Sequence, residues 1–171
     1  MKKTIVTKSL EETQDFARNM AQELSGGEVL LLFGDLGAGK TTFIQGLAEG
    51  LGITQRIISP TFLIMRSYII PFSFSSPQSL SFPRKRESIQ RIGSPIKPGM
   101  TTLYHLDLYR INSEDDLEGL GIREILDDKN SIVAIEWPEK LGHFLPKKRI
   151  ELHFTNFSEK ERKITVIKVQ C

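Results

Sequence analysis

The residues with the clearest chemical potential lie in one glycine-rich stretch, Gly34 to Thr41, whose sequence GDLGAGKT fits the spacing G-x-x-x-x-G-K-[ST]. In a loop of this kind, backbone N–H groups turn inward and bind phosphate oxygens, and the helix that follows adds unpaired donors. A lysine placed as Lys40 is reaches the outer phosphates, and a hydroxyl placed as that of Thr41 ligates Mg²⁺. The spacing therefore predicts a site for a nucleotide with magnesium. The alternative is a glycine-rich turn with an incidental lysine.

Two carboxylates follow apolar segments that are expected to be strands. Glu136 ends the run SIVAIE, and Asp107 lies within HLDLYR. Phosphoryl transfer needs a carboxylate to hold the metal's water shell and a group to place the nucleophile. The carboxyl ends of parallel strands meet at one edge of a sheet, so we predict that both acids, with Lys40, are catalytic. A solvated acid at a strand end is the alternative for Glu136, and a surface strand residue is the alternative for Asp107.

The elements that must position these residues alternate along the chain. The pattern predicts a single α/β domain over residues 1–171 of the P-loop NTPase type, in which a mostly parallel central sheet is flanked by helices and an antiparallel hairpin ends the chain. Helices are expected at 10–24 and 40–51, with shorter helical turns after residue 112. Strands or extended segments are expected at 28–33, 57–68, 103–110, 131–137, 150–154 and 163–169.

Composition restricts the class of protein. The hydrophobic share of 39% and the charged share of 26% are ordinary for a globular domain. No apolar run approaches the roughly 18 residues of a membrane span, and no signal peptide is evident. The single cysteine, Cys171, has no internal partner for a disulfide. These features predict a cytoplasmic protein without a membrane contact.

One segment differs from the rest of the chain. Residues 70–102 hold five of the eight prolines, seven serines and a basic cluster, PRKR, so the remainder of the chain is mildly acidic. This composition predicts an insertion that forms a surface loop or is disordered. Two hypotheses remain for it, a nucleic-acid-binding arm or a tolerated insert with no site of its own.

The sequence also restricts which class of nucleotide-binding protein this chain can be. The N-K-x-D stretch by which GTPases commonly bind guanine is missing, since the nearest text is DDKNS at residues 127–131. Adenine is therefore favoured over guanine. A kinase acting on a small molecule or a protein remains an alternative, although the only segment that could form its arginine-bearing lid lacks helical periodicity.

Five motifs in order then make the sequence resemble the TsaE family, the bacterial ATPases needed to form threonylcarbamoyladenosine in tRNA. They are GDLGAGKTT, SPTF, HLDLYR, GIRE and IEWPE. The resemblance implies a Mg²⁺-dependent ATPase of low intrinsic activity that resets a complex of TsaD-like and TsaB-like proteins. Contact with tRNA would be indirect. Relatives have a much shorter link between SPTF and HLDLYR, so the insertion could hinder docking to these partners.

The resemblance also implies roles for individual residues. Thr41 and Glu136 would hold Mg²⁺, Asp107 would act in hydrolysis, and Thr61 would lie in a switch segment near the γ-phosphate. The residues expected to bind ATP are Leu36, Gly37, Ala38, Gly39, Lys40, Thr41, Thr42 and Thr61, with Thr13 and Arg162 at the border of the adenine or phosphates. Two further residues keep two hypotheses each. His105 is a proton carrier or a strand histidine with a satisfied hydrogen bond, and Trp137 contacts the nucleotide or is a buried anchor.

Overall fold

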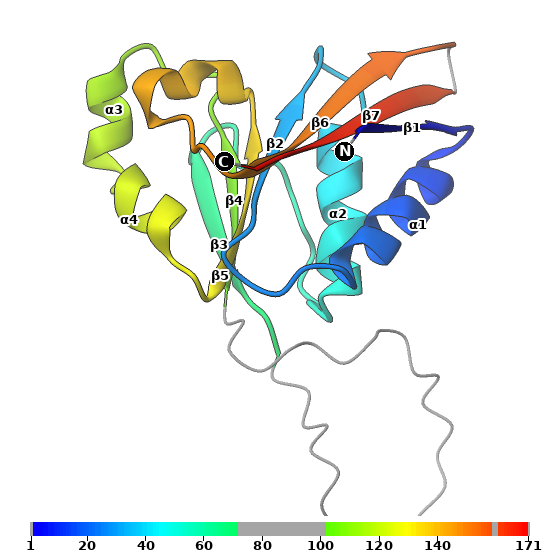
Figure 1. The fold of residues 1–171 in the computed structure, drawn as a ribbon, viewed down its shortest axis with the longest axis horizontal. Helices are drawn as coiled ribbons and strands as arrows, with labels where there is room; N and C mark the ends of the chain where they lie inside the picture. The colour runs from blue at the N-terminus through cyan, green and yellow to red at the C-terminus, as the bar shows by residue number, and fades with distance from the viewer. Residues whose placement is uncertain (1, 72–101, 159–160, 171) are drawn as a thin grey trace, which may run out of the picture.

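The computed structural model describes residues 2–71, 102–158 and 161–170 (Figure 1). The strands are β1 (Lys2–Thr7), β2 (Val29–Phe33), β3 (Met65–Ile69), β4 (Thr102–Asp107), β5 (Ser131–Glu136), β6 (Arg149–Asn156) and β7 (Arg162–Val169). The helices are α1 (Leu10–Ala21), α2 (Lys40–Gly50), α3 (Glu114–Gly119) and α4 (Ile122–Asp127), with a 3₁₀ segment η1 (Pro138–Phe144). The strands form one seven-stranded sheet in the order β1-β7-β6-β2-β5-β4-β3.

The middle of the sheet is parallel and its margins are antiparallel. Strands β6, β2, β5 and β4 run in the same direction, whereas β3, β7 and β1 oppose their neighbours. The predicted mixed α/β architecture and the C-terminal antiparallel hairpin, formed by β6 and β7, are confirmed. Because the four central strands are parallel, their carboxyl ends lie along one edge, where ligands bind in open α/β sheets.

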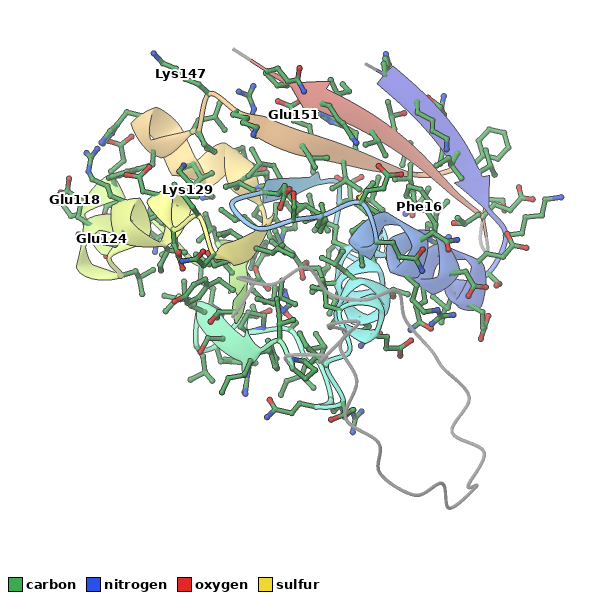
Figure 2. All side chains as sticks on the ribbon, turned by 60° about the horizontal axis from the view of Figure 1, so that its bottom comes forward. Phe16, Glu118, Glu124, Lys129, Lys147 and Glu151 are labelled. Atoms are coloured by element: carbon green, nitrogen blue, oxygen red, sulfur yellow. The ribbon has the colours of Figure 1, made fainter. Side chains whose placement is uncertain are left out.

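Helices cover both faces of the sheet and create two apolar layers (Figure 1). On one face, α1 and α2 bury residues such as Phe43 and Leu47 against Leu30 and Leu152. On the other face, α3, α4 and η1 bury Leu117 and residues near it against the opposite sides of β2 and β5. Figure 2 shows that Glu118 and Glu124 project from the α3–α4 layer, on the side of the molecule away from α1. The sheet is thus buried on both faces at its centre, as the continuous apolar runs of β2 and β5 predict.

Two glycines let α1 pack closely against α2. A Cβ atom on Gly46 would lie 2.4 Å from the backbone oxygen of Gln14, and one on Gly50 would lie 2.7 Å from the Cβ of Ala21. Helix α1 begins after Ser9, whose side chain caps it by accepting from the N–H of Glu12 at 3.1 Å. It ends at Ala21 and not at the predicted residue 24, since the next three N–H groups bond to carbonyls three residues back.

The segment predicted as extended over residues 57–68 is strand only from Met65 onward. Pro60 has no N–H for a strand ladder, and its carbonyl accepts from the N–H groups of both Leu63 and Ile64, at 2.8 Å and 2.6 Å. This turn places Ile64 in the left-handed region, with φ of 64°. Strand β1 was not predicted, because its charged start, KKT, gives it the weak apolar signal of an edge strand.

Strands β3 and β4 are antiparallel neighbours on either side of the predicted insertion. Ile69 of β3 lies opposite Thr102 of β4, so the chain leaves and re-enters the sheet at adjacent positions. The interior of the segment predicted as an insertion, residues 72–101, lies outside the described residues, and that prediction remains untested.

In the described ranges, none of the helices combines the length and the apolar character required to cross a lipid bilayer. The prediction of a cytoplasmic location is not tested further by the structure.

Candidate active site at the carboxyl edge of the sheet

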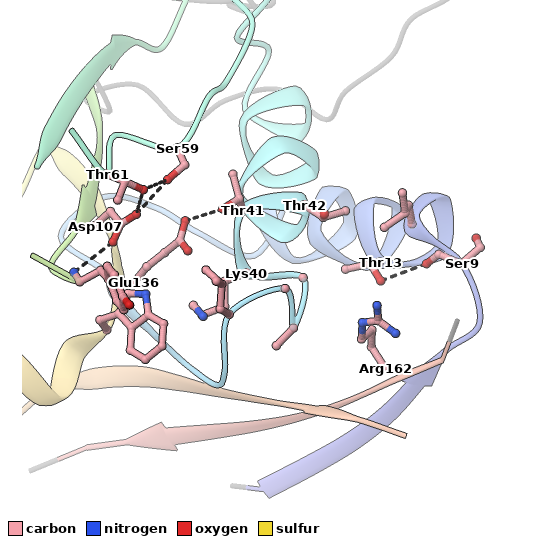
Figure 3. Close-up of a pocket in the computed structure, with 17 residues that line it drawn as sticks. Ser9, Thr13, Lys40, Thr41, Thr42, Ser59, Thr61, Asp107, Glu136 and Arg162 are labelled. Atoms are coloured by element: carbon pink, nitrogen blue, oxygen red, sulfur yellow. Dashed lines mark hydrogen bonds between the residues drawn. The ribbon is translucent and has the colours of Figure 1, made fainter. Parts of the chain in front are cut away.

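A cavity of about 390 Å³ opens at the carboxyl ends of β2, β5 and β4, in front of the start of α2 (Figure 3). Its walls come from the glycine-rich loop, the end of β5, the segment before β3 and the start of α1. The lining residues are Ser9, Leu10, Thr13, Leu36, Gly37, Ala38, Gly39, Lys40, Thr41, Thr42, Ser59, Thr61, Asp107, Tyr109, Glu136, Trp137 and Arg162. Every residue that the sequence analysis placed in the site lies in this lining.

Glycines give the loop between β2 and α2 its shape. Gly34, Gly37 and Gly39 have φ values of 140°, 77° and 100°, which residues with a Cβ atom rarely adopt. At Gly34 a Cβ atom would also lie 2.6 Å from the backbone oxygen of Phe154. Gly39 precedes α2 and has no side chain with which to cap the first N–H groups of the helix, which starts at the cavity. This geometry suits a bound anion.

Lys40 lies at the floor of the cavity and is almost fully buried. Its ammonium group donates to the carbonyl oxygens of Gly34 at 2.6 Å and of Asp35 at 2.8 Å. The same group lies 4.3 Å from the centre of the Trp137 ring, a cation–π contact. Burial lowers the pKa of Lys40 from its ordinary value, although the nearby carboxylates of Glu136 and Asp107 oppose the shift. A buried cation is therefore held where phosphate oxygens would neutralise it.

Glu136 connects the end of β5 to α2 and to β4. Its Oε1 atom accepts from the hydroxyl of Thr41 at 2.9 Å, the contact drawn in Figure 3. The Nε2 atom of His105 lies 3.0 Å from the same oxygen. Glu136 is 4% exposed and His105 is fully buried. The carboxylate is thus fixed by a helix hydroxyl from one side and by an imidazole from the other.

Asp107 organises the segment that carries SPTF. Its Oδ2 atom accepts from the hydroxyls of Ser59 at 2.8 Å and Thr61 at 2.5 Å, and its Oδ1 atom accepts from the N–H of Tyr109 at 3.1 Å. Asp107 is 3% exposed. The carboxylate therefore holds this segment against the mouth of the cavity.

The other end of the cavity is formed by the start of α1 and the start of β7. Thr13 is buried, and its hydroxyl lies 2.8 Å from that of Thr7 and donates to the Ser9 carbonyl at 3.1 Å. Arg162, the first residue of β7, lies across from Thr13 in Figure 3. Ser9 and Leu10 also line the cavity and were not predicted as site residues, since neither lies in one of the five motifs.

The polar groups of the cavity fit a magnesium nucleotide better than a metal held by protein alone. The described residues contain no cluster of three or more His, Cys, Asp or Glu side chains arranged to bind an ion. Thr41 and Glu136, joined by their hydrogen bond, would supply one or two oxygen ligands. Mg²⁺ commonly takes that few from a protein and fills its other positions with water and substrate phosphate.

These features define a mixed α/β protein with a glycine-rich loop between a buried strand and a helix, and with two strand-end carboxylates facing that loop. Comparison with known proteins assigns the chain to one family within this class. A family model described as threonylcarbamoyl adenosine biosynthesis protein TsaE matches residues 7–74 and 92–164. The chain belongs to the TsaE family, whose members act in the biosynthesis of threonylcarbamoyladenosine in tRNA.

Individual relatives agree with this assignment. The tRNA threonylcarbamoyladenosine biosynthesis protein TsaE of Bacillus subtilis is 36% identical over 155 residues, which cover 91% of this chain and 78% of that protein. The protein of the same name from Treponema pallidum is 30% identical over 94% of this chain and 97% of its own length. The crystal structure of Bacillus subtilis YdiB is similar with a TM-score of 0.67 and 28% identity, over 99% of this chain and 87% of that chain.

Proposed function

We propose that this protein is a Mg²⁺-dependent ATPase that supports the formation of threonylcarbamoyladenosine in tRNA, as an accessory of TsaD-like and TsaB-like proteins. The observation that carries the proposal is that Lys40, the Thr41–Glu136 pair and Asp107 line a single cavity beside the glycine-rich loop. The family assignment supports the connection with tRNA modification.

In this proposal the loop N–H groups and Lys40 bind the phosphates of ATP. Binding replaces the two neutral carbonyl partners of Lys40 by phosphate oxygens, which form stronger, charge-assisted hydrogen bonds with an ammonium group. Thr41 and Glu136 would hold Mg²⁺, and that ion would neutralise charge on the phosphate oxygens.

Asp107 has the place and the chemistry to orient water for hydrolysis. The water oxygen bonds to the γ-phosphorus, the bond from that phosphorus to the bridging oxygen breaks, and the proton that the water loses passes to the phosphate oxygens. The products are ADP and inorganic phosphate. A carboxylate at the cavity mouth accepts a hydrogen bond from that water. Its contacts with Ser59 and Thr61 would couple the segment around SPTF to the presence of the γ-phosphate.

The test uses ATP labelled on the γ-phosphate, with the protein alone and with purified TsaD-like and TsaB-like proteins and tRNA. We expect slow release of labelled phosphate by the protein alone, and repeated rounds of tRNA modification only when all components and hydrolysable ATP are present. Label transferred to an acceptor other than water would contradict the proposal and identify a kinase.

Variants connect the activity to the cavity. Lys40→Ala should abolish ATP binding measured by calorimetry. Lys147→Ala, a change two residues before the start of β6 and outside the cavity lining, should leave ATP binding unchanged. Glu136→Gln should reduce turnover far more than nucleotide affinity. ATP affinity that survives Lys40→Ala would refute the assignment of the loop.

A further inference from the structure

His105 occupies a position in the sheet where an apolar side chain would be expected. It faces the α1–α2 layer from the middle of β4, in register with Ala134 of β5. Its neighbours on that face include Leu103 and Ile132, both fully buried. An imidazole that is fully buried among such residues costs free energy unless its polar atoms are used.

The hydrogen bonds of His105 identify its tautomer. Nε2 lies 3.0 Å from Glu136 Oε1, while buried Nδ1 has no hydrogen-bond partner anywhere in the described chain. A buried N–H without an acceptor is costlier than a bare acceptor nitrogen, so the proton is assigned to Nε2. His105 then donates to Glu136 Oε1, which also accepts from the Thr41 hydroxyl.

Two donors on one oxygen fix the direction of the carboxylate. Oε1 of Glu136 receives both hydrogen bonds, and within the described residues Oε2 receives none. The Thr41 bond comes from a residue that itself borders the cavity. Of the residues that the structure describes, only His105 holds the carboxylate from inside the sheet, beyond the cavity lining.

We propose that His105 is a positioning residue, which orients the Glu136 carboxylate so that its second oxygen stays available to the magnesium shell of a bound nucleotide. This inference rests on the proposed function, and it assigns His105 no contact with nucleotide. Outer-shell hydrogen bonds of this kind commonly change metal affinity by tenfold or more.

The experiment compares ADP affinity with and without Mg²⁺ by calorimetry in five proteins, the wild type and four variants. His105→Gln keeps an N–H donor at the position of Nε2. His105→Met introduces an unbranched side chain as long as that of glutamine but without the donor. We expect His105→Met to reduce the Mg²⁺-dependent gain in affinity by about tenfold and to leave affinity without Mg²⁺ unchanged. His105→Gln should restore the gain to within about threefold of wild type.

Glu136→Gln and the double variant His105→Met/Glu136→Gln complete a cycle. If His105 acts through Glu136, adding His105→Met to Glu136→Gln should change the Mg²⁺-dependent gain no further. Additive losses, or a loss in His105→Met that appears equally without Mg²⁺, would overturn the inference. An absence of any Mg²⁺-dependent gain in the wild type would instead contradict the proposed function.

A measurement on the free protein tests the tautomer without nucleotide. Long-range ¹H–¹⁵N correlation spectra should show the His105 proton on Nε2. A proton on Nδ1 would also overturn the inference, even if every variant at this position failed to fold.

Discussion

Asp107 and Glu136 lie directly opposite each other at the carboxyl ends of two adjacent parallel strands, yet they hold different parts of the protein. Glu136 is joined to the first turn of α2 through Thr41, and Asp107 is joined to the segment before β3 through Ser59 and Thr61. A charged group that binds between these two acids would therefore act on α2 through Glu136 and on the loop before β3 through Asp107.

The link between Asp107 and Thr61 predicts that this loop depends on one hydroxyl. Thr61→Val keeps the shape of the side chain and removes the donor to a buried carboxylate, a bond of about 1.5–3 kcal/mol. We expect faster amide hydrogen exchange in residues 59–64 and a loss of stability of that order. Thr165→Val removes a hydroxyl from an exposed Thr4–Thr165 contact and should change neither quantity measurably. Equal exchange in the two variants would contradict this account.

The contact between α1 and α2 predicts an unusual effect of alanine. In most helices Gly→Ala stabilises, but at Gly46 the added methyl group would meet the backbone of Gln14. We expect Gly46→Ala to lower the free energy of unfolding by about 1–3 kcal/mol in denaturant titrations. Gly119→Ala is the control, because nothing lies within 4 Å of its added Cβ and it should be neutral or stabilising.

The buried charge of Lys40 predicts a pH-dependent difference between two proteins. Because burial lowers the pKa of Lys40 from 10.5, the unfolded state binds the proton more readily between the lowered pKa and 10.5. The cost of the buried charge is therefore complete at neutral pH and disappears as pH rises through that interval. Lys40→Met should raise the melting temperature by a few degrees at pH 7 and lose this advantage near pH 10.5. A difference that stays constant with pH would exclude this explanation.

The pairing of Ile69 with Thr102 predicts that the intervening chain is dispensable for the fold. Replacing residues 72–101 by Asn-Gly leaves a four-residue connection, a length common in hairpins. We expect the melting temperature and ATP affinity to stay within error of the full chain. Binding to tRNA at two salt concentrations then tests the basic cluster, since phosphate contacts give a steep salt dependence. If the full chain binds tRNA with a steep salt dependence and the replaced variant does not, the segment is a nucleic-acid-binding arm.

The glycine-rich loop could be predicted because its conformation restricts the sequence. Gly37 and Gly39 have φ values of 77° and 100°, and a backbone position with such a φ favours glycine in any fold. The acids at the ends of β4 and β5 could be predicted for a similar reason, since two buried parallel strands must bring their carboxyl ends together. Patterns within short segments were therefore enough to predict the loop and the two strand-end acids.

Other features depend on contacts between distant segments. The turn after Pro60 replaces a strand through hydrogen bonds to one carbonyl, which no periodicity reveals. The bond between His105 and Glu136 exists only in the observed register of β4 on β5. Thr13 and Arg162 were placed by family resemblance alone, and the pairing of β1 with β7 explains why they border one cavity. Their roles in binding ATP remain predictions.

The position of β1 has a consequence for synthesis on the ribosome. Among the described strands, the sole partner of β1 is β7, the last to emerge. A nascent chain that stops before Arg162 would leave the earliest described strand unpaired and would lack one lining residue of the cavity, Arg162 itself. Termination of translation shortly before Arg162 should therefore yield a protein with an incomplete site, recognisable to proteases by its loose amino-terminal strand.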